Sequence, residues 1–165
     1  MSGVRIRAAR RDDIERIWEL LLGLARFERL EHEVSGTPER LAEDLFEAPP
    51  KVECLVAEVE GMLVGYALFY PTYSSFSTAS MLWLEDLYVV PERRGRGDGR
   101  ALLAALGRLA LERGCRRMGW SVLDWNADSI RFYEGLGARR AGVDWLQYRL
   151  DEAGLAALGE PSRKT

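Results

Sequence analysis

The chain has 165 residues, of which 47% are hydrophobic and 30% charged, and its formal net charge is -3 at pH 7. These values fit a single globular domain over residues 1–165 with a core at about 4–150, and the acidic balance argues against nucleic acid as the main partner. No apolar run approaches the ~18 residues of a membrane span, and none resembles a secretory leader, so we expect no membrane association and a cytoplasmic location.

The first third of the chain predicts one strand and two helices. Apolar and polar residues alternate over 4–9, which is typical of a half-buried strand. Apolar residues at helical spacing over 14–25 then predict a helix, with Asp12 or Asp13 as its cap. The dipeptide Thr37-Pro38 supplies a cap and a first helical residue for a second helix, which ends before the two prolines that follow.

The middle of the chain predicts strands. Residues 55–59 and 62–70 form two apolar segments, and a hairpin turn at 60–61 would join them. Residues 71–80 are polar and rich in serine and threonine, so they predict a loop. Residues 81–90 are almost continuously apolar, which is typical of a central strand.

The last third predicts a helix at 99–113, a strand at 117–123, a short helix opening at Asn126 and a strand region at 139–150. The tail at 160–165 is expected to be disordered. Together the elements follow the order β-α-α-β-β-β-α-β-α-β. This alternation predicts an α/β fold with a mixed central sheet and helices on both faces.

Residues that usually hold metals or form hydrolytic triads are few. The chain has one histidine, His32, and two cysteines far apart, Cys54 and Cys115. No zinc-site spacing, nucleophile-elbow motif or P-loop is present. We therefore expect no metal, and we interpret both cysteines as buried apolar residues.

A glycine-rich turn follows the strand at 81–90. Glycines alternate with other residues over Arg94-Gly-Arg-Gly-Asp-Gly99, and Arg100 comes next. Bare backbone N–H groups at a helix start, with arginines beside them, form a typical anion site. The alternative is an ordinary strand–helix turn with solvated arginines. Asp98 does not suit an anion site unless its carboxylate points away from the ligand.

Two segments resemble one family. The turn at 94–99 resembles the R/Q-x-x-G-x-G/A motif of the GNAT superfamily of acyl-CoA N-acyltransferases, and residues 126–138 resemble its N-x-x-A/S-x-x-F-Y-x-x-x-G-A/F segment. Residues 26–31, 69–73 and 84–89 resemble the diamine (spermidine/spermine) N-acetyltransferase branch and its thialysine-acetylating relatives. The resemblance spans about 4–150 and implies the GNAT-like fold.

The resemblance implies acetyl-CoA as the acetyl donor. The diphosphate would lie on the glycine turn, and the pantetheine arm would pair with the strand before it, where the fourth and fifth strands splay apart. The second motif would flank the arm. The implied cofactor-binding residues are Leu87, Tyr88, Val89, Arg94, Gly95, Arg96, Gly97, Gly99, Arg100, Asn126 and Ser129.

Two acid–base residues are implied for an amine acceptor. An amine must lose its proton before it attacks a thioester, and Glu85 is the candidate base. We expect Asp86, the next residue along an extended strand, to point to the opposite face. Tyr133 is the implied proton donor to the leaving thiolate, and N–H groups near Leu87 would stabilise the thioester oxygen. The alternative is that both carboxylates are structural.

The acceptor side is implied to be acidic. Its residues are Glu28, Glu31, Asp86, Asp144 and Trp145. A solvated acidic face is the alternative interpretation of the glutamates. The implied acceptors are diamines, polyamines and lysine-like amino acids. Ser74 stands where polyamine enzymes carry an acidic residue, which argues against a long polyamine and leaves shorter diamines and amino-acid side-chain amines.

The implied enzyme is a homodimer that transfers the acetyl group by direct attack in a ternary complex. A non-catalytic acyl-CoA-binding module, or an enzyme acting on a peptide or protein amine, remains an alternative.

Overall fold

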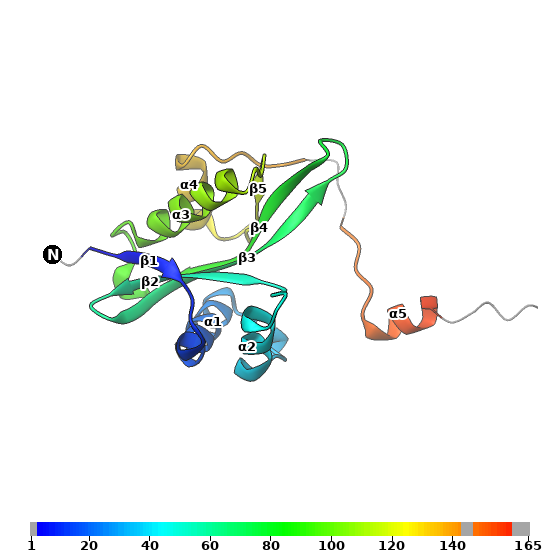
Figure 1. The fold of residues 1–165 in the computed structure, drawn as a ribbon, viewed down its shortest axis with the longest axis horizontal. Helices are drawn as coiled ribbons and strands as arrows, with labels where there is room; N and C mark the ends of the chain where they lie inside the picture. Colours follow the sequence, from blue (N-terminus) through cyan, green and yellow to red (C-terminus); the bar gives the residue numbers. More distant parts are fainter. Residues whose placement is uncertain (1–2, 143–146, 160–165) are drawn as a thin grey trace, which may run out of the picture. The chain divides into compact units, whose positions relative to one another are not determined.

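The computed structural model describes residues 3–142 and 147–159 (Figure 1). The chain divides into two compact units, 1–123 and 124–165. The first unit holds a five-stranded sheet in the order β1-β2-β3-β4-β5. The first three pairings are antiparallel and the β4–β5 pairing is parallel. The strands are β1 (Arg5–Ala8), β2 (Glu53–Val59), β3 (Met62–Ser74), β4 (Ala79–Val89) and β5 (Met118–Gly119).

Helices cover both faces of this sheet (Figure 1). Helices α1 (Ile14–Glu28) and α2 (Pro38–Phe46) lie on one face, and α3 (Asp98–Glu112) lies on the other. Three short 3₁₀ turns join these elements: η1 (Arg11–Asp13), η2 (Glu31–Glu33) and η3 (Pro91–Arg93). The predicted mixed α/β class with helices on both faces is therefore confirmed.

Apolar burial explains why α1 lies where it does. Ile17 and Leu20 of α1 are buried in one cluster with Val56, Tyr66 and other residues of the sheet. Leu82 and Leu84 of β4 are likewise almost fully buried. Side chains at alternate positions of β4 thus pack in the core. The polar side chains of this strand therefore need hydrogen-bond partners.

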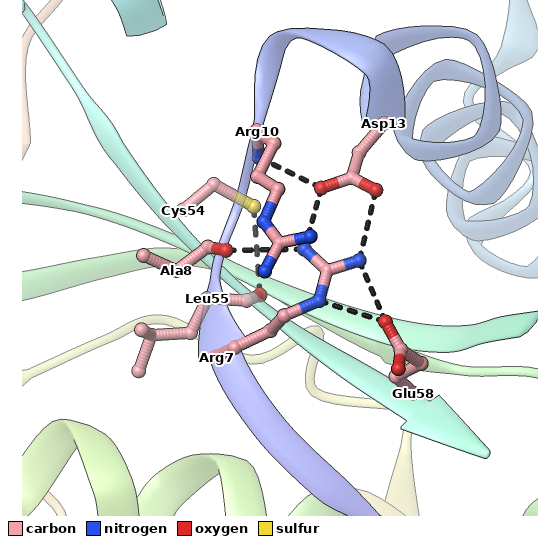
Figure 2. A network of polar contacts seen from close by, with 7 residues as sticks. All are labelled: Arg7, Ala8, Arg10, Asp13, Cys54, Leu55 and Glu58. Atoms are coloured by element: carbon pink, nitrogen blue, oxygen red, sulfur yellow. Dashed lines mark hydrogen bonds and ion pairs between the residues drawn. The ribbon is translucent and has the colours of Figure 1, made fainter. Parts of the chain in front are cut away.

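The start of α1 differs from the prediction (Figure 2). Asp13 makes no cap bond to α1. Its carboxylate instead accepts from the Arg10 N–H at 2.7 Å and from the Arg7 guanidinium at 2.6 and 3.0 Å. Arg7 also donates to Glu58 at 2.7 Å. Arg7 of β1 therefore connects Glu58 of β2 with Asp13 of η1. Thr37, by contrast, caps α2 as predicted, accepting from the Arg40 N–H.

Two predicted segments are wrong in extent. The loop predicted at 71–80 is a strand over most of its length, because β3 continues to Ser74 and β4 begins at Ala79. Proline at position 71 is tolerated because β2 pairs with β3 only as far as Phe69, which leaves an edge there. The strand predicted at 117–123 pairs with β4 only over β5.

The second unit contains α4 (Ala127–Gly135) and α5 (Glu152–Gly159). No strand occurs in the described parts of the predicted strand region, 139–142 and 147–150, and α5 was not predicted. A sequence pattern shows which side chains a strand would bury, but it does not show whether the edge of another strand is available for pairing. The expectation of a single domain stays a prediction.

Among the described residues, no helix combines the length and apolarity needed to cross a membrane. Nor do any three His, Cys, Asp or Glu side chains in 3–142 and 147–159 gather where they could hold a metal ion. Cys54 and Cys115 are both buried, as predicted. Burial raises the pKa of the Cys54 thiol, which makes it a poor nucleophile.

Candidate active site

The glycine turn has the backbone conformation that its sequence suggests. Gly95 and Gly97 have φ of 75° and 91°, in the left-handed region that favours glycine. Gly97 directly precedes α3, and its carbonyl accepts the first helical bond, from the Ala101 N–H at 2.9 Å. The N–H groups of residues 98–100, which come before Ala101, therefore have no acceptor carbonyl within α3 and face the turn.

Two arginine side chains add positive charge beside these amide N–H groups. Arg96 and Arg100 are exposed, and within the described part of the chain neither forms an ion pair. Positive side chains beside the amino end of a 15-residue helix make a favourable position for an anion. The turn thus supports the predicted anion site.

Arg94 is engaged differently from its neighbours. Its Nε donates to the Val89 carbonyl at 3.1 Å, and its guanidinium carbon lies 4.5 Å from the centre of the Phe27 ring and 5.6 Å from that of Tyr88. The side chain therefore connects the turn to β4 and α1. An anion bound on the turn would compete with these contacts for the Arg94 guanidinium.

The outer edge of β4 is open where the resemblance implies a pantetheine arm. Strand β5 pairs with β4 only at Leu82 and Trp83, and no other described strand pairs with that edge. The Val90 N–H donates to β3, at the carbonyl of Val64. By alternation, the backbone groups of Leu87 and Val89 face the open edge.

Tyr88 does not share this orientation. Its backbone faces β3, and its side chain is 8% exposed within the core cluster. A Cβ added at Gly23 of α1 would lie 2.8 Å from the Tyr88 hydroxyl, which shows how closely the ring fits against that helix. Of the three residues implied for the arm, the structure therefore brings two to the edge.

A β-bulge in β4 sets the direction in which the two carboxylates of this strand point. Leu84 pairs with Phe69 and Asp86 pairs with Leu68, so Glu85 is an extra residue without an opposite partner on β3. The expectation that Asp86 points away from the face of Glu85 is wrong, because it assumed a regular strand.

Hydrogen bonds show which face the two carboxylates share. The Tyr70 hydroxyl donates to Glu85 and the Tyr66 hydroxyl donates to Asp86, both at 3.0 Å. Tyr66 and Tyr70 are four residues apart on β3 and lie on one face by alternation. Glu85 and Asp86 therefore lie together on the face covered by α1 and α2.

The two carboxylates have different surroundings. Asp86 is partly buried, and desolvation raises its pKa to about 6 despite the opposing hydrogen bond from Tyr66. The charges of Glu85 and Glu28 add to that increase. Glu85 is exposed and accepts a second hydrogen bond, from Trp83 Nε1 at 3.0 Å. One carboxylate can thus exchange a proton near neutral pH, and the other is accessible and held by two donors.

Glu28 at the end of α1 completes an acidic group with Glu85 and Asp86. Burial raises the pKa of Glu28, and its charge acts on both Asp86 and Tyr66. Glu31 lies on η2 and is exposed. Grouped carboxylates at the edge of a core attract a cation, because a cation relieves their mutual repulsion.

The second unit carries the remaining predicted residues. Asn126 is buried, and its Oδ1 accepts from the Ser129 N–H at 3.2 Å, which caps α4. Tyr133 is partly buried on α4, with its ring centre 5.3 Å from that of Phe132. The predicted acceptor-side residues Asp144 and Trp145 lie outside the described residues.

Sequence reasoning missed the donors that hold the carboxylates. Tyr66, Tyr70 and Trp83 fit an apolar strand pattern, and nothing in that pattern shows that their polar atoms serve Glu85 and Asp86. The available signal was that these aromatic residues carry a polar atom, because a buried tyrosine hydroxyl or tryptophan N–H usually needs a hydrogen-bond partner.

A mixed sheet with an open β4 edge, followed by a glycine turn at a helix start, defines the acyl-CoA N-acyltransferase class of fold. The chain belongs to the acetyltransferase (GNAT) family, whose sequence profile matches residues 13–138. It is an acetyltransferase.

Known proteins resemble it over nearly all of its length. A thialysine N-epsilon-acetyltransferase of Mus musculus is 37% identical over 161 residues, covering 92% of this chain and 94% of that protein. An L-ornithine N5-acetyltransferase of Arabidopsis thaliana is 28% identical, covering 93% and 87%. The solved structure of an aminoglycoside N-acetyltransferase in complex with CoA superposes with a TM-score of 0.75 at 22% identity, covering 91% of this chain and 96% of that one.

Proposed function

We propose that this enzyme transfers an acetyl group from acetyl-CoA to the primary amine of a small cationic acceptor, by direct attack in a ternary complex. The observation that carries the proposal is the β4 bulge, which brings Glu85 and Asp86 to one face of the sheet, where the charge of Glu28 on α1 also acts on Asp86. Among diamines, polyamines and amino acids, we favour an amino acid with a side-chain amine, because the relatives from mouse and Arabidopsis are named for such substrates.

The donor would be held by backbone and arginines. The amides at the start of α3, with Arg96 and Arg100, suit the diphosphate. The Leu87 and Val89 backbone groups on the open edge suit the amide-rich pantetheine arm, which could add like a strand. Asn126 and Ser129 are proposed to contribute to binding of the coenzyme, an expectation that comes from the family resemblance.

The acceptor would be held by carboxylates. Asp86 and Glu28 are proposed to bind its positive charge in a partly buried setting, where such attraction is stronger than in water. Glu85, which is exposed and fixed by Tyr70 and Trp83, is proposed to take the proton from the amine, directly or through a water molecule. A lysine-like amine has a pKa near 10.4, so without this step few molecules could attack.

Attack by the amine forms the C–N bond and a tetrahedral intermediate, and collapse of this intermediate breaks the C–S bond and releases the thiolate. The Leu87 N–H is proposed to stabilise the oxygen of the tetrahedral intermediate. Tyr133 is proposed to donate its proton to the leaving thiolate. We also propose that the enzyme is a homodimer, an expectation that comes from the family resemblance.

A panel of acceptors tests the proposal. Purified protein is incubated with acetyl-CoA and with thialysine, ornithine, lysine, a diamine, a polyamine or a peptide, and thiol release is followed. We expect release that depends on a small amine, with an amino acid as the best acceptor. Release only with the peptide would overturn the acceptor class, and CoA binding without any release would favour the non-catalytic module.

A further inference from the structure

A carboxylate lies at the start of the helix that faces the proposed diphosphate. Asp98 is the first residue of α3, and it is 2% exposed. A negative charge at this position should repel an anionic ligand. Its burial therefore needs an explanation beyond helix formation.

The structure gives Asp98 one strong partner. Arg93 Nε donates to Asp98 Oδ2 at 2.7 Å, and a second guanidinium nitrogen of Arg93 donates to Oδ1 at 3.1 Å. This is the two-point geometry in which arginine holds a carboxylate most specifically. The negative charge faces Arg93 rather than the solvent side of the turn.

The ion pair spans the whole glycine turn. Arg93 ends η3 and Asp98 begins α3, so the four residues 94–97 form a loop between the two partners. A Cβ added at Gly95 or Gly97 would meet no atom within 4 Å. The two glycines therefore gain no order from side-chain packing and make the loop costly to order, whereas the Arg94 side chain anchors its first residue to β4 and α1. Within the loop, the Arg96 N–H donates to the Arg93 carbonyl at a long 3.4 Å.

We infer that Arg93 and Asp98 are positioning residues, which fix the shape of the glycine turn before the coenzyme arrives. The inference rests on the proposed function, since it assumes that the turn binds the diphosphate. The pair neutralises itself, and Arg96 and Arg100 remain to meet the ligand. A turn ordered in advance binds more tightly, because the ordering entropy is not lost on binding.

The direction in which one substitution changes the affinity for CoA separates this positioning role from simple electrostatics. Asp98→Asn removes a negative charge and releases Arg93, so charge alone predicts tighter CoA binding. A positioning role predicts weaker binding, by about tenfold in Kd, with the KM of the acceptor amine unchanged. The matched control is Glu53→Gln, which removes a carboxylate that receives the same two-point bond from Arg113, at 2.6 and 2.7 Å, away from the turn.

The experiment is calorimetry with CoA on the full chain, with thermal unfolding measured in parallel. Absence of binding by the unmodified protein would contradict the proposed function itself. Binding by that protein together with equal or tighter binding by Asp98→Asn would overturn the positioning role alone. If Asp98→Asn does not fold, Arg93→Lys keeps the charge but loses the two-point geometry; we expect about tenfold weaker binding, and an unchanged Kd would refute the inference.

Discussion

Replacing Asp86 by asparagine should stabilise the protein at alkaline pH. The pKa of Asp86 is about 6 in the folded protein, against an ordinary value of 3.8. A difference of roughly two in pKa corresponds to about 3 kcal/mol between the two protonation states. Asparagine is neutral at every pH, and its oxygen can still accept the hydrogen bond from Tyr66.

The sign follows from where each state binds the proton. The raised pKa means that the folded protein holds the proton more tightly than the unfolded chain. This stabilising contribution is fully present below about pH 4, and it is lost as the pH rises through about 6. At about pH 8 the ionised Asp86 therefore lowers the free energy of unfolding by up to about 3 kcal/mol, a loss that the variant avoids.

Urea unfolding of both proteins, from about pH 4 to about pH 8, measures this difference. We expect Asp86→Asn to gain stability over the unmodified protein as the pH rises, while it loses acetyltransferase activity. Glu19→Gln, at an exposed carboxylate of α1, is the control and should show no such trend. A difference independent of pH, or a variant that is less stable at about pH 8, would refute the reasoning.

Three further predictions concern catalysis and the sheet. Tyr133→Phe should lower kcat by about 10²-fold while acetyl-CoA still binds, and an unchanged kcat would remove its proposed role; Tyr148→Phe, an exposed tyrosine, is the control. Glu85→Gln should lower kcat by about 10²-fold and abolish the acidic limb of the pH–rate profile, whereas a limb that persists near pH 6 would assign the base to Asp86. Arg7→Met should lower the free energy of unfolding by about 2 kcal/mol at neutral pH, measured by urea unfolding. That loss should shrink in acid, because Arg7 lowers the pKa of Asp13 and this stabilisation disappears as the pH falls through the folded pKa; a constant loss would contradict it.

Local signals with a chemical mechanism could be predicted from the sequence. Thr37 caps α2, and Gly97 takes the left-handed conformation before α3. Asn126 likewise starts α4, where its side chain accepts the bond that caps the helix. Each feature depends on a few neighbouring residues, so one segment of sequence contains the information.

Features that depend on pairing could not be predicted. The bulge at Glu85 arises from the register between β3 and β4, which no periodicity shows. The same limit explains the strand expected at 117–123, which pairs with β4 over two residues only. Asp98 looked unsuitable for an anion site until the structure showed Arg93 facing it.

Binding of the acceptor amine at the bulge is the most direct test of the account. Calorimetry would compare the CoA-loaded protein with its Glu85→Gln/Asp86→Asn variant, using a lysine-like amine as the titrant. We expect the variant to bind the amine about 10²-fold more weakly while its Kd for CoA stays the same. Equal affinity of both proteins for the amine would contradict the assignment of these carboxylates to the acceptor.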